Sequence, residues 1–231
     1  MKIITPLLIM AMVAPVYAGS KDDPLLTSIT FDALEWRDAG SEESLNWDVE
    51  AWIGKDLHKL WMKAEGEREQ GVTTETEWQL LYNRAVTPFW DLQLGFRFDA
   101  KPEPSRDWLV LGLQGVAPYF VETEASLFIG EAGQTGLRLN LEYELLMTQR
   151  WVLVPEFEFN AHTRNDRQTH TGSGLSELEL GLRLHYEISR EVAPYVGVSW
   201  AKQYGNTADF SRAAGEKTQD NAVVLGLKLT F

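Results

Sequence analysis

The sequence predicts an all-β protein, an antiparallel up-and-down β-barrel that spans an outer membrane, and three observations support this prediction. Apolar and polar residues alternate along many short segments, short turns and longer polar loops alternate between those segments, and the last segment ends on Phe231. Successive side chains of a strand point to opposite faces, so alternation gives each strand one apolar and one polar face. A barrel wall between lipid and a wet lumen requires this arrangement.

The alternation is clearest between residues 177 and 188. The apolar set is Leu178, Leu180, Leu182, Leu184, Tyr186 and Ile188, and the other set is Glu177, Glu179, Gly181, Arg183, His185 and Glu187. An amphipathic helix would space its apolar residues by three and four, so this segment is predicted to be a strand.

Similar patterns predict about twelve strands, an even number as in bacterial single-chain barrels. Their ranges are 27–37, 44–54, 57–68, 74–86, 89–99, 106–116, 119–129, 135–147, 150–161, 176–188, 193–202 and 221–231. The first is the least regular, because Leu34 and Trp36 fall in its inward phase. Without it and one partner, the prediction would be a barrel of about ten strands.

The connections alternate in length. Tight turns are expected at 54–56, 87–88, 117–118, 148–149 and 189–191, and longer polar loops at 38–43, 69–73, 100–105, 130–134, 162–175 and 203–220. Outer-membrane barrels have short periplasmic turns and longer extracellular loops. Both ends of the barrel sequence are therefore expected on the periplasmic side of a cell outer membrane.

The first residues have the pattern of a secretory signal peptide. Lys2 precedes a largely apolar run, which ends in Val16-Tyr17-Ala18 before Gly19. We expect residues 1–18 to be cleaved, 19–26 to form a short periplasmic segment and 27–231 to form the barrel. The expected partners are outer-membrane lipids and the insertion machinery, with Phe231 as the insertion signal.

Composition excludes several classes of protein. There is no cysteine, so thiol chemistry and thiolate metal sites are absent. Asp and Glu number 34 against 21 Lys and Arg, which disfavours nucleic-acid binding. Nine Trp and an aromatic content of 11% fit the aromatic girdles of a barrel.

The predicted lumen is acidic. The inward carboxylates are Asp48, Glu50, Glu65, Glu77, Asp91, Asp99, Glu122, Glu124, Glu142, Glu144, Glu156, Glu158, Glu177 and Glu179. The opposing inward cations are Lys59, Lys63, Arg97, Arg138, Arg183, His185 and Lys228. Such a lumen could select cations, or its charges could form ion-pair networks that hold the wall together. Inward Trp52, Trp61 and Trp108 favour a constricted passage.

Six sequence stretches resemble the outer-membrane copper resistance protein B family, over nearly all of the predicted mature chain. They are DVEAWIG (48–54), NRAVTPFWDL (83–92), QGVAPY (114–119), GSGLSELELGLR (172–183), VAPYVGV (192–198) and GNTA (205–208). The resemblance implies a barrel that moves or sequesters copper at the outer membrane, beside a periplasmic multicopper oxidase. Many members carry a Met- and His-rich segment ahead of the barrel. That segment's role is not carried over, since the whole chain has four His and five Met.

For copper, imidazole and thioether are the expected ligands, and carboxylate is acceptable for Cu(II). His185 with Glu179 and Glu187 is the best candidate site, although a lone inward His also fits a lumen hydrogen bond. His58, near the periplasmic mouth, and His162, toward an extracellular loop, are further candidates. Transient binding suits passage, because a conducted ion must also leave.

An enzyme is the rival class, and we expect this chain not to be one. A barrel hydrolase would need a His close to a Ser or carboxylate at a rim. His170 with Asp166 and Ser173 is the one suggestive cluster, and a solvated loop explains it equally well. A general cation-selective barrel and a purely structural barrel remain as alternatives.

Overall fold

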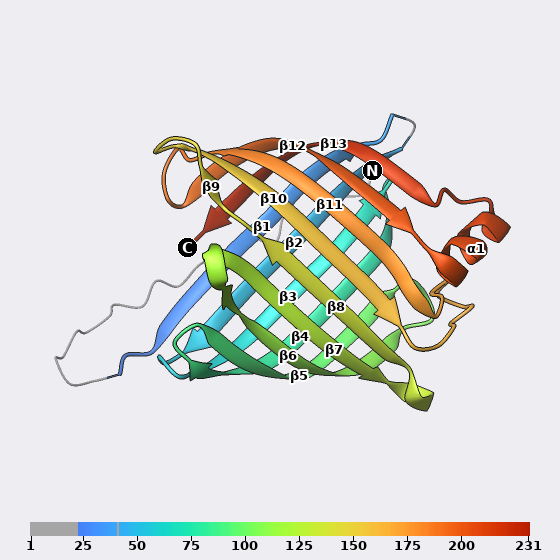
Figure 1. The fold of residues 1–231 in the computed structure, drawn as a ribbon, viewed down its shortest axis with the longest axis horizontal. Coiled ribbons are helices and arrows are strands. Elements are labelled where there is room, and N and C mark those ends of the chain that lie inside the picture. Colours follow the sequence, from blue (N-terminus) through green and yellow to red (C-terminus); the bar gives the residue numbers. More distant parts are fainter. Residues whose placement is uncertain (1–22, 41) are drawn as a thin grey trace, which may run out of the picture.

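One antiparallel sheet closes on itself into a barrel in the computed structural model, which describes residues 23–40 and 42–231 (Figure 1). Its strands are β1 (Leu26–Asp38), β2 (Glu43–Gly54), β3 (His58–Glu69), β4 (Val72–Thr87), β5 (Trp90–Lys101), β6 (Arg106–Ala117), β7 (Val121–Gly130), β8 (Thr135–Glu142), β9 (Leu145–Leu146), β10 (Trp151–His162), β11 (Gly174–Tyr186), β12 (Val192–Gln203) and β13 (Gln219–Thr230). The predicted signal peptide lies outside the described residues.

β8 and β9 are two pieces of one strand. Both pair with β10 in one continuous register, with Glu142 opposite Glu156 and Leu145 opposite Leu153. The break falls opposite Pro155, which has no N–H to donate to the strand ladder. Counting β8 and β9 as one strand, the sheet has the twelve strands that the sequence predicts.

The barrel closes where β1 pairs with β13. The backbone N–H of Phe231 donates to the Ile29 carbonyl at 2.8 Å, and the Ile29 N–H donates to the Phe231 carbonyl at 3.0 Å. The last residue therefore belongs to the closing seam. Its use as an insertion signal stays a prediction.

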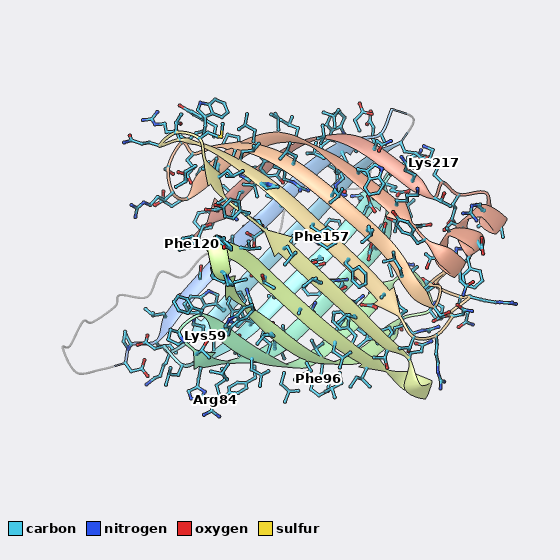
Figure 2. All side chains as sticks on the ribbon, in the orientation of Figure 1. Lys59, Arg84, Phe96, Phe120, Phe157 and Lys217 are labelled. Carbon is cyan, nitrogen blue, oxygen red and sulfur yellow. The ribbon has the colours of Figure 1, made fainter. Side chains whose placement is uncertain are left out.

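The outer wall is apolar. Phe96 is 69% exposed and stands away from the barrel wall in Figure 2, and Leu94, Leu180 and Leu182 are also exposed on the outside. Exposed side chains of this kind over a closed sheet match a lipid-facing surface. The described residues contain no helix long and apolar enough to cross a membrane.

A bulge in β1 overturns the predicted phase of its second half. The pairing of β1 with β2 changes register between Phe31 and Ala33, and its pairing with β13 changes register between Phe31 and Glu35. The extra residue turns Leu34 and Trp36 outward, where they are 39% and 37% exposed, and turns Glu35 inward, where it is 2% exposed. The expectation that Leu34 and Trp36 face the lumen was wrong, because period-two counting fails across a bulge.

The connections differ from the prediction in two places. The expected long loop at 69–73 is a two-residue turn at Gln70 and Gly71, both with positive φ, which suits a tight hairpin. The expected loop at 203–220 contains a helix, α1 (Gly205–Ala214), which ends at Gly215 in the left-handed conformation. In Figure 1, α1 lies at the opposite end of the barrel from the C-terminus. By the length asymmetry of the connections, we name the α1 end extracellular and the other end periplasmic.

Candidate functional site

In the described part of the chain, a cavity lies toward each end of the lumen. The larger, of about 380 Å³, is lined by Trp108, His162, Glu177 and other residues of the extracellular half, and is here called the vestibule. The smaller, of about 150 Å³, is lined by His185, Glu142 and their neighbours, and is called the periplasmic cavity. Three groups of ion pairs, named together the ion-pair belt, occupy the lumen around and between these cavities.

The first group of the belt centres on Lys63 of β3, which is 3% exposed. Its Nζ lies 2.8 Å from Glu50 Oε1 on β2 and 2.6 Å from Glu124 Oε2 on β7. Because β7 is four strands from β3 around the sheet, Lys63 spans the lumen rather than one face of it.

The second group joins β3, β4, β5 and β8. Arg138 lies 2.9 Å from Glu77 and 3.3 Å from Glu65, and Arg97 lies 2.8 Å from the same Glu77. Arg97 also holds Asp99 at 2.6 Å, and Asp99 accepts a hydrogen bond from Trp108 Nε1 at 2.8 Å. Every cation of this group is bound by more than one carboxylate.

The third group joins β1, β10 and β11. Arg183 lies 2.8 Å from Glu35 and also pairs with Glu156. Arg37 lies 2.6 Å from the same Glu35 and 3.1 Å from Glu179. Since β11 and β1 are separated by β12 and β13, these pairs cross part of the lumen.

One side of the lumen is apolar. Leu81, Val110, Phe128 and Trp108 form a buried cluster on the inner face of β4, β6 and β7, and Trp61 packs against it. The Arg97 guanidinium lies 4.5 Å from the centre of the Phe128 ring, a cation–π distance. This cluster fills one side of the lumen, in line with the inward placement expected of Trp61 and Trp108.

The vestibule contains carboxyl groups that form no ion pair among the described residues. Glu177 and Glu75 line it and form no ion pair with any described residue. Glu177 is near enough to Glu158, Glu75 and Glu67 for their charges to act on it. This part of the lumen therefore has more carboxyl groups than cationic side chains.

A loop residue helps to shape the vestibule rim. Asp166, between β10 and β11, accepts hydrogen bonds from Arg106 at 2.7 and 2.9 Å. Burial alone would raise the pKa of Asp166, but the hydrogen bonds from Arg106 and from the Gln168 backbone outweigh it and lower the pKa. Asp166 is therefore ionised at neutral pH and ties the loop to β6.

The predicted lumen carboxylates lie on the inner face of the wall. Glu50, Glu65, Glu77, Glu124, Glu156, Glu158 and Glu179 take part in the belt, Glu142 and Glu144 line the periplasmic cavity, and Asp91 accepts a hydrogen bond from Asn83 at 2.6 Å. Asp48 has a buried oxygen, and Glu122 shares the phase of buried Ser126. Strand phase alone was enough to place this set.

The predicted metal ligands are dispersed. His185 and Glu187 both line the periplasmic cavity. Glu179 lies six residues before His185 on β11, about 20 Å away along the strand, and binds Arg37. His58 is exposed, and its Nδ1 lies 2.5 Å from the outward Tyr82 hydroxyl. His162 lines the vestibule. Within residues 23–40 and 42–231, no three His or carboxylate side chains converge as a ready-made metal site.

His185 has an unusual environment. It is 8% exposed, stacks on Tyr195 with ring centres 4.5 Å apart, and its Nε2 has no hydrogen-bond partner. Glu142, Glu144, Glu187 and Lys228 line the same cavity. Lys228 is held 3.0 Å from Asp32, so the cavity keeps an excess of carboxylates.

The cluster suggested for a hydrolase is not assembled. His170 Nδ1 lies 3.7 Å from Glu216, and Asp166 is bound to Arg106. Ser173 Oγ accepts a hydrogen bond from Asn206 at 3.1 Å. Each member has a different partner, so the three do not form a nucleophile–base pair.

Sequence reasoning missed Glu35 and Arg37, which the β1 bulge brings into the lumen, and did not name Asp32, which pairs with Lys228 there. A signal was present in the sequence, since a strand that carries four charged residues needs a polar face for them. The partners of His162 were also missed.

Comparison with known families and proteins supports the fold and the location. The family model described as "Copper resistance protein B precursor" matches residues 25–231. The chain is 42% identical to "Copper resistance protein B" of Escherichia coli over 203 residues, 88% of this chain and 69% of that protein. It is 45% identical to the "Copper resistance protein B homolog" of Pseudomonas syringae pv. tomato over 210 residues, 91% of this chain and 71% of that one.

Solved structures with this architecture include two porins. The NanC porin matches with a TM-score of 0.58 at 10% identity, and the KdgM porin with 0.52 at 12% identity. Each match covers 88% of this chain and 99% of the porin. At such low identity the likeness concerns the barrel fold alone.

Proposed function

Because the chain belongs to the copper resistance protein B family and is a barrel of the outer membrane, we propose that it binds copper ions and passes them through its acidic lumen. The observation that carries this proposal is the pair of vestibule carboxylates Glu75 and Glu177, which have no ion-pair partner among the described residues. Copper is here the cargo rather than a resident cofactor.

The electrostatics of the lumen support cation entry. A cavity lined by one sign of charge, with low-dielectric walls, concentrates ions of the opposite sign. Glu75 and Glu177 supply that charge, and the belt beyond them also has more carboxylates than cations. Charged rings of this kind give pores their preference for cations.

In this proposal, the periplasmic cavity is the exit. His185 offers an imidazole, and Glu187 and Glu142 offer carboxylates, the ligand types that Cu(II) accepts. With Lys228 in the same cavity, binding would be weak enough for release. A periplasmic multicopper oxidase would be a suitable recipient at this end.

The test compares two matched double substitutions. Glu75→Gln with Glu177→Gln removes the vestibule charge, and Glu103→Gln with Glu191→Gln removes equal charge from an exposed loop and turn. We expect only the vestibule variant to lower cation preference in planar bilayers and copper survival of cells, at equal folded yield.

Two results would decide against the proposal in different ways. If the vestibule variant changed neither property, the lumen charges would be structural. If cation preference fell and copper survival did not, the barrel would be a general cation pore.

A further inference from the structure

His162 is held by a buried hydrogen-bond chain at the extracellular end of β10. Its Nδ1 lies 2.8 Å from Ser176 Oγ, and the Ser176 hydroxyl lies 3.1 Å from the Gly172 carbonyl oxygen. Ser176 is 4% exposed. Because a carbonyl can only accept, the Ser176 hydroxyl donates to Gly172, and Nδ1 of His162 then donates to Ser176.

The chain's backbone is built to place these groups together. Between β10 and β11, Asn160 pairs with Glu177 and Ala161 pairs with Leu175, so Ser176 is an extra residue in a β-bulge. Because of the bulge, the consecutive residues Ser176 and Glu177 both face the lumen. At the other end, the Gly172 N–H donates to Thr207 Oγ1 of α1 at 2.8 Å. A Cβ on Gly172 would lie 2.1 Å from the Thr207 nitrogen, so only glycine permits this approach.

The second ring nitrogen of His162 is left available. With the proton on Nδ1, Nε2 carries a lone pair, and it accepts no hydrogen bond from the described residues. The ring lies beside Trp108, with centres 6.5 Å apart, and lines the vestibule. Gly136 of β8 pairs with His162, and a Cβ on Gly136 would lie 3.2 Å from His162 Nε2. The absence of a side chain at Gly136 therefore leaves space beside Nε2.

We infer that His162 Nε2 is a ligand for a copper ion in the vestibule, and that Ser176 is its positioning residue. This inference rests on the proposed function and assigns an entry site to it. Metal-binding imidazoles usually donate their other N–H to a fixed acceptor, which sets the tautomer and the ring orientation. Here Ser176 is that acceptor.

The surroundings of His162 suit a weak, exchangeable site. Arg97 and Arg138 face it, but both are bound by Glu77 and by further carboxylates of the belt. Glu177, beside Ser176, lines the same cavity and forms no ion pair with another described residue. One imidazole with carboxylate and water ligands is a borderline set that Cu(II) accepts and can leave.

The first test uses Cu(II) alone, added to the purified full barrel in detergent and followed by electron paramagnetic resonance. We expect His162→Gln to remove the imidazole-nitrogen coupling of the vestibule site and to weaken binding at least about tenfold. His58→Gln, which changes an exposed His on the outer face near the other end of the barrel, is the matched control and should bind as wild type does. Unchanged coupling and affinity in His162→Gln would overturn the inference.

The second test addresses Ser176 through the tautomer. Nitrogen-15 NMR of histidine-labelled barrel without copper should show the His162 proton on Nδ1, and Ser176→Ala should release that preference and weaken Cu(II) binding about 10- to 100-fold. A wild-type proton on Nε2 would contradict the positioning role, because a merely structural Ser176 would not set the tautomer.

The outcomes separate this inference from the proposed function. If the His162 variant binds Cu(II) normally while the vestibule Glu variant loses copper survival, passage stands and the entry ligand is wrong. If Cu(II) binds at His162 while the Glu variant behaves as wild type, the site stands and passage by vestibule charge is wrong.

Discussion

Arg183 on β11 donates two hydrogen bonds to Glu35 on β1, at 2.8 and 3.2 Å, across the inner face of β12 and β13. Glu35 is 2% exposed and Arg183 is 6% exposed. A carboxylate removed from water to this extent requires a cation and hydrogen bonds to stay ionised. The pair therefore fixes the closing seam of the barrel from the inside.

Arg183→Met should destabilise the folded barrel by about 3–5 kcal/mol, because Glu35 and Glu156 lose a buried cation. Arg212→Met removes an exposed ion pair with Asp209 on α1 and should change stability by less than about 0.5 kcal/mol. Urea unfolding in lipid bilayers measures both. Equal effects of the two substitutions would mean that the Arg183 pair adds nothing to stability.

The Glu35 position also shows where sequence reasoning stops. Alternation placed the strands of the wall and nearly all of their inward carboxylates, since lipid and water impose opposite demands on the two faces. It failed after Asp32, because one extra residue in a strand reverses the phase without any change of composition. It likewise gave no account of α1, which lies in a polar segment with no marked apolar face.

The candidate sites were predictable only in part. Strand phase put His185 and Glu187 on one face, and the structure brings both to one cavity. The His162 network depends on a bulge at Ser176, on the approach of α1 to Gly172, and on contacts between distant segments. Those relationships arise from tertiary structure, which period-two counting does not reach.

The lipid face gives a second prediction. Leu182→Arg, near the middle of β11, should cost about 2–4 kcal/mol because the guanidinium would lie in hydrocarbon. Ile188→Arg, in the turn after β11, should cost at most about 1 kcal/mol because the interface is close. Leu182 and Ile188 are both exposed apolar side chains in the wild-type protein. Folding titrations of the two variants in bilayers therefore compare the effect of membrane depth on the same substituted residue. Equal costs would show that Leu182 does not lie at mid-membrane.

The ion-pair belt gives a third prediction. Lys63→Met should raise cation conductance in planar bilayers, since it removes a buried positive charge that bridges Glu50 and Glu124 across the lumen. Lys59→Met is the matched control, because Lys59 lies over the Trp52 ring and forms no ion pair with the described residues. If conductance rose equally in both variants, the belt would not be the constriction.

Acid should release the loop that Asp166 holds. The lowered pKa of Asp166 means that its contribution to stability is complete above the unfolded value and is lost as pH falls through the folded value. Hydrogen exchange in residues 163–173, corrected for its intrinsic pH dependence, should therefore accelerate in strong acid. Asp166→Asn should show fast exchange already at neutral pH. A loop protected equally in both proteins would refute the role of Arg106 and Asp166.

The most direct test of copper passage through the lumen is a crystal structure of the barrel soaked in Cu(II), with anomalous data collected at the copper absorption edge. We expect anomalous density inside the barrel, in the vestibule beside His162 and Glu177. Density confined to the outer wall or to the exposed His58, with an empty lumen, would contradict this expectation.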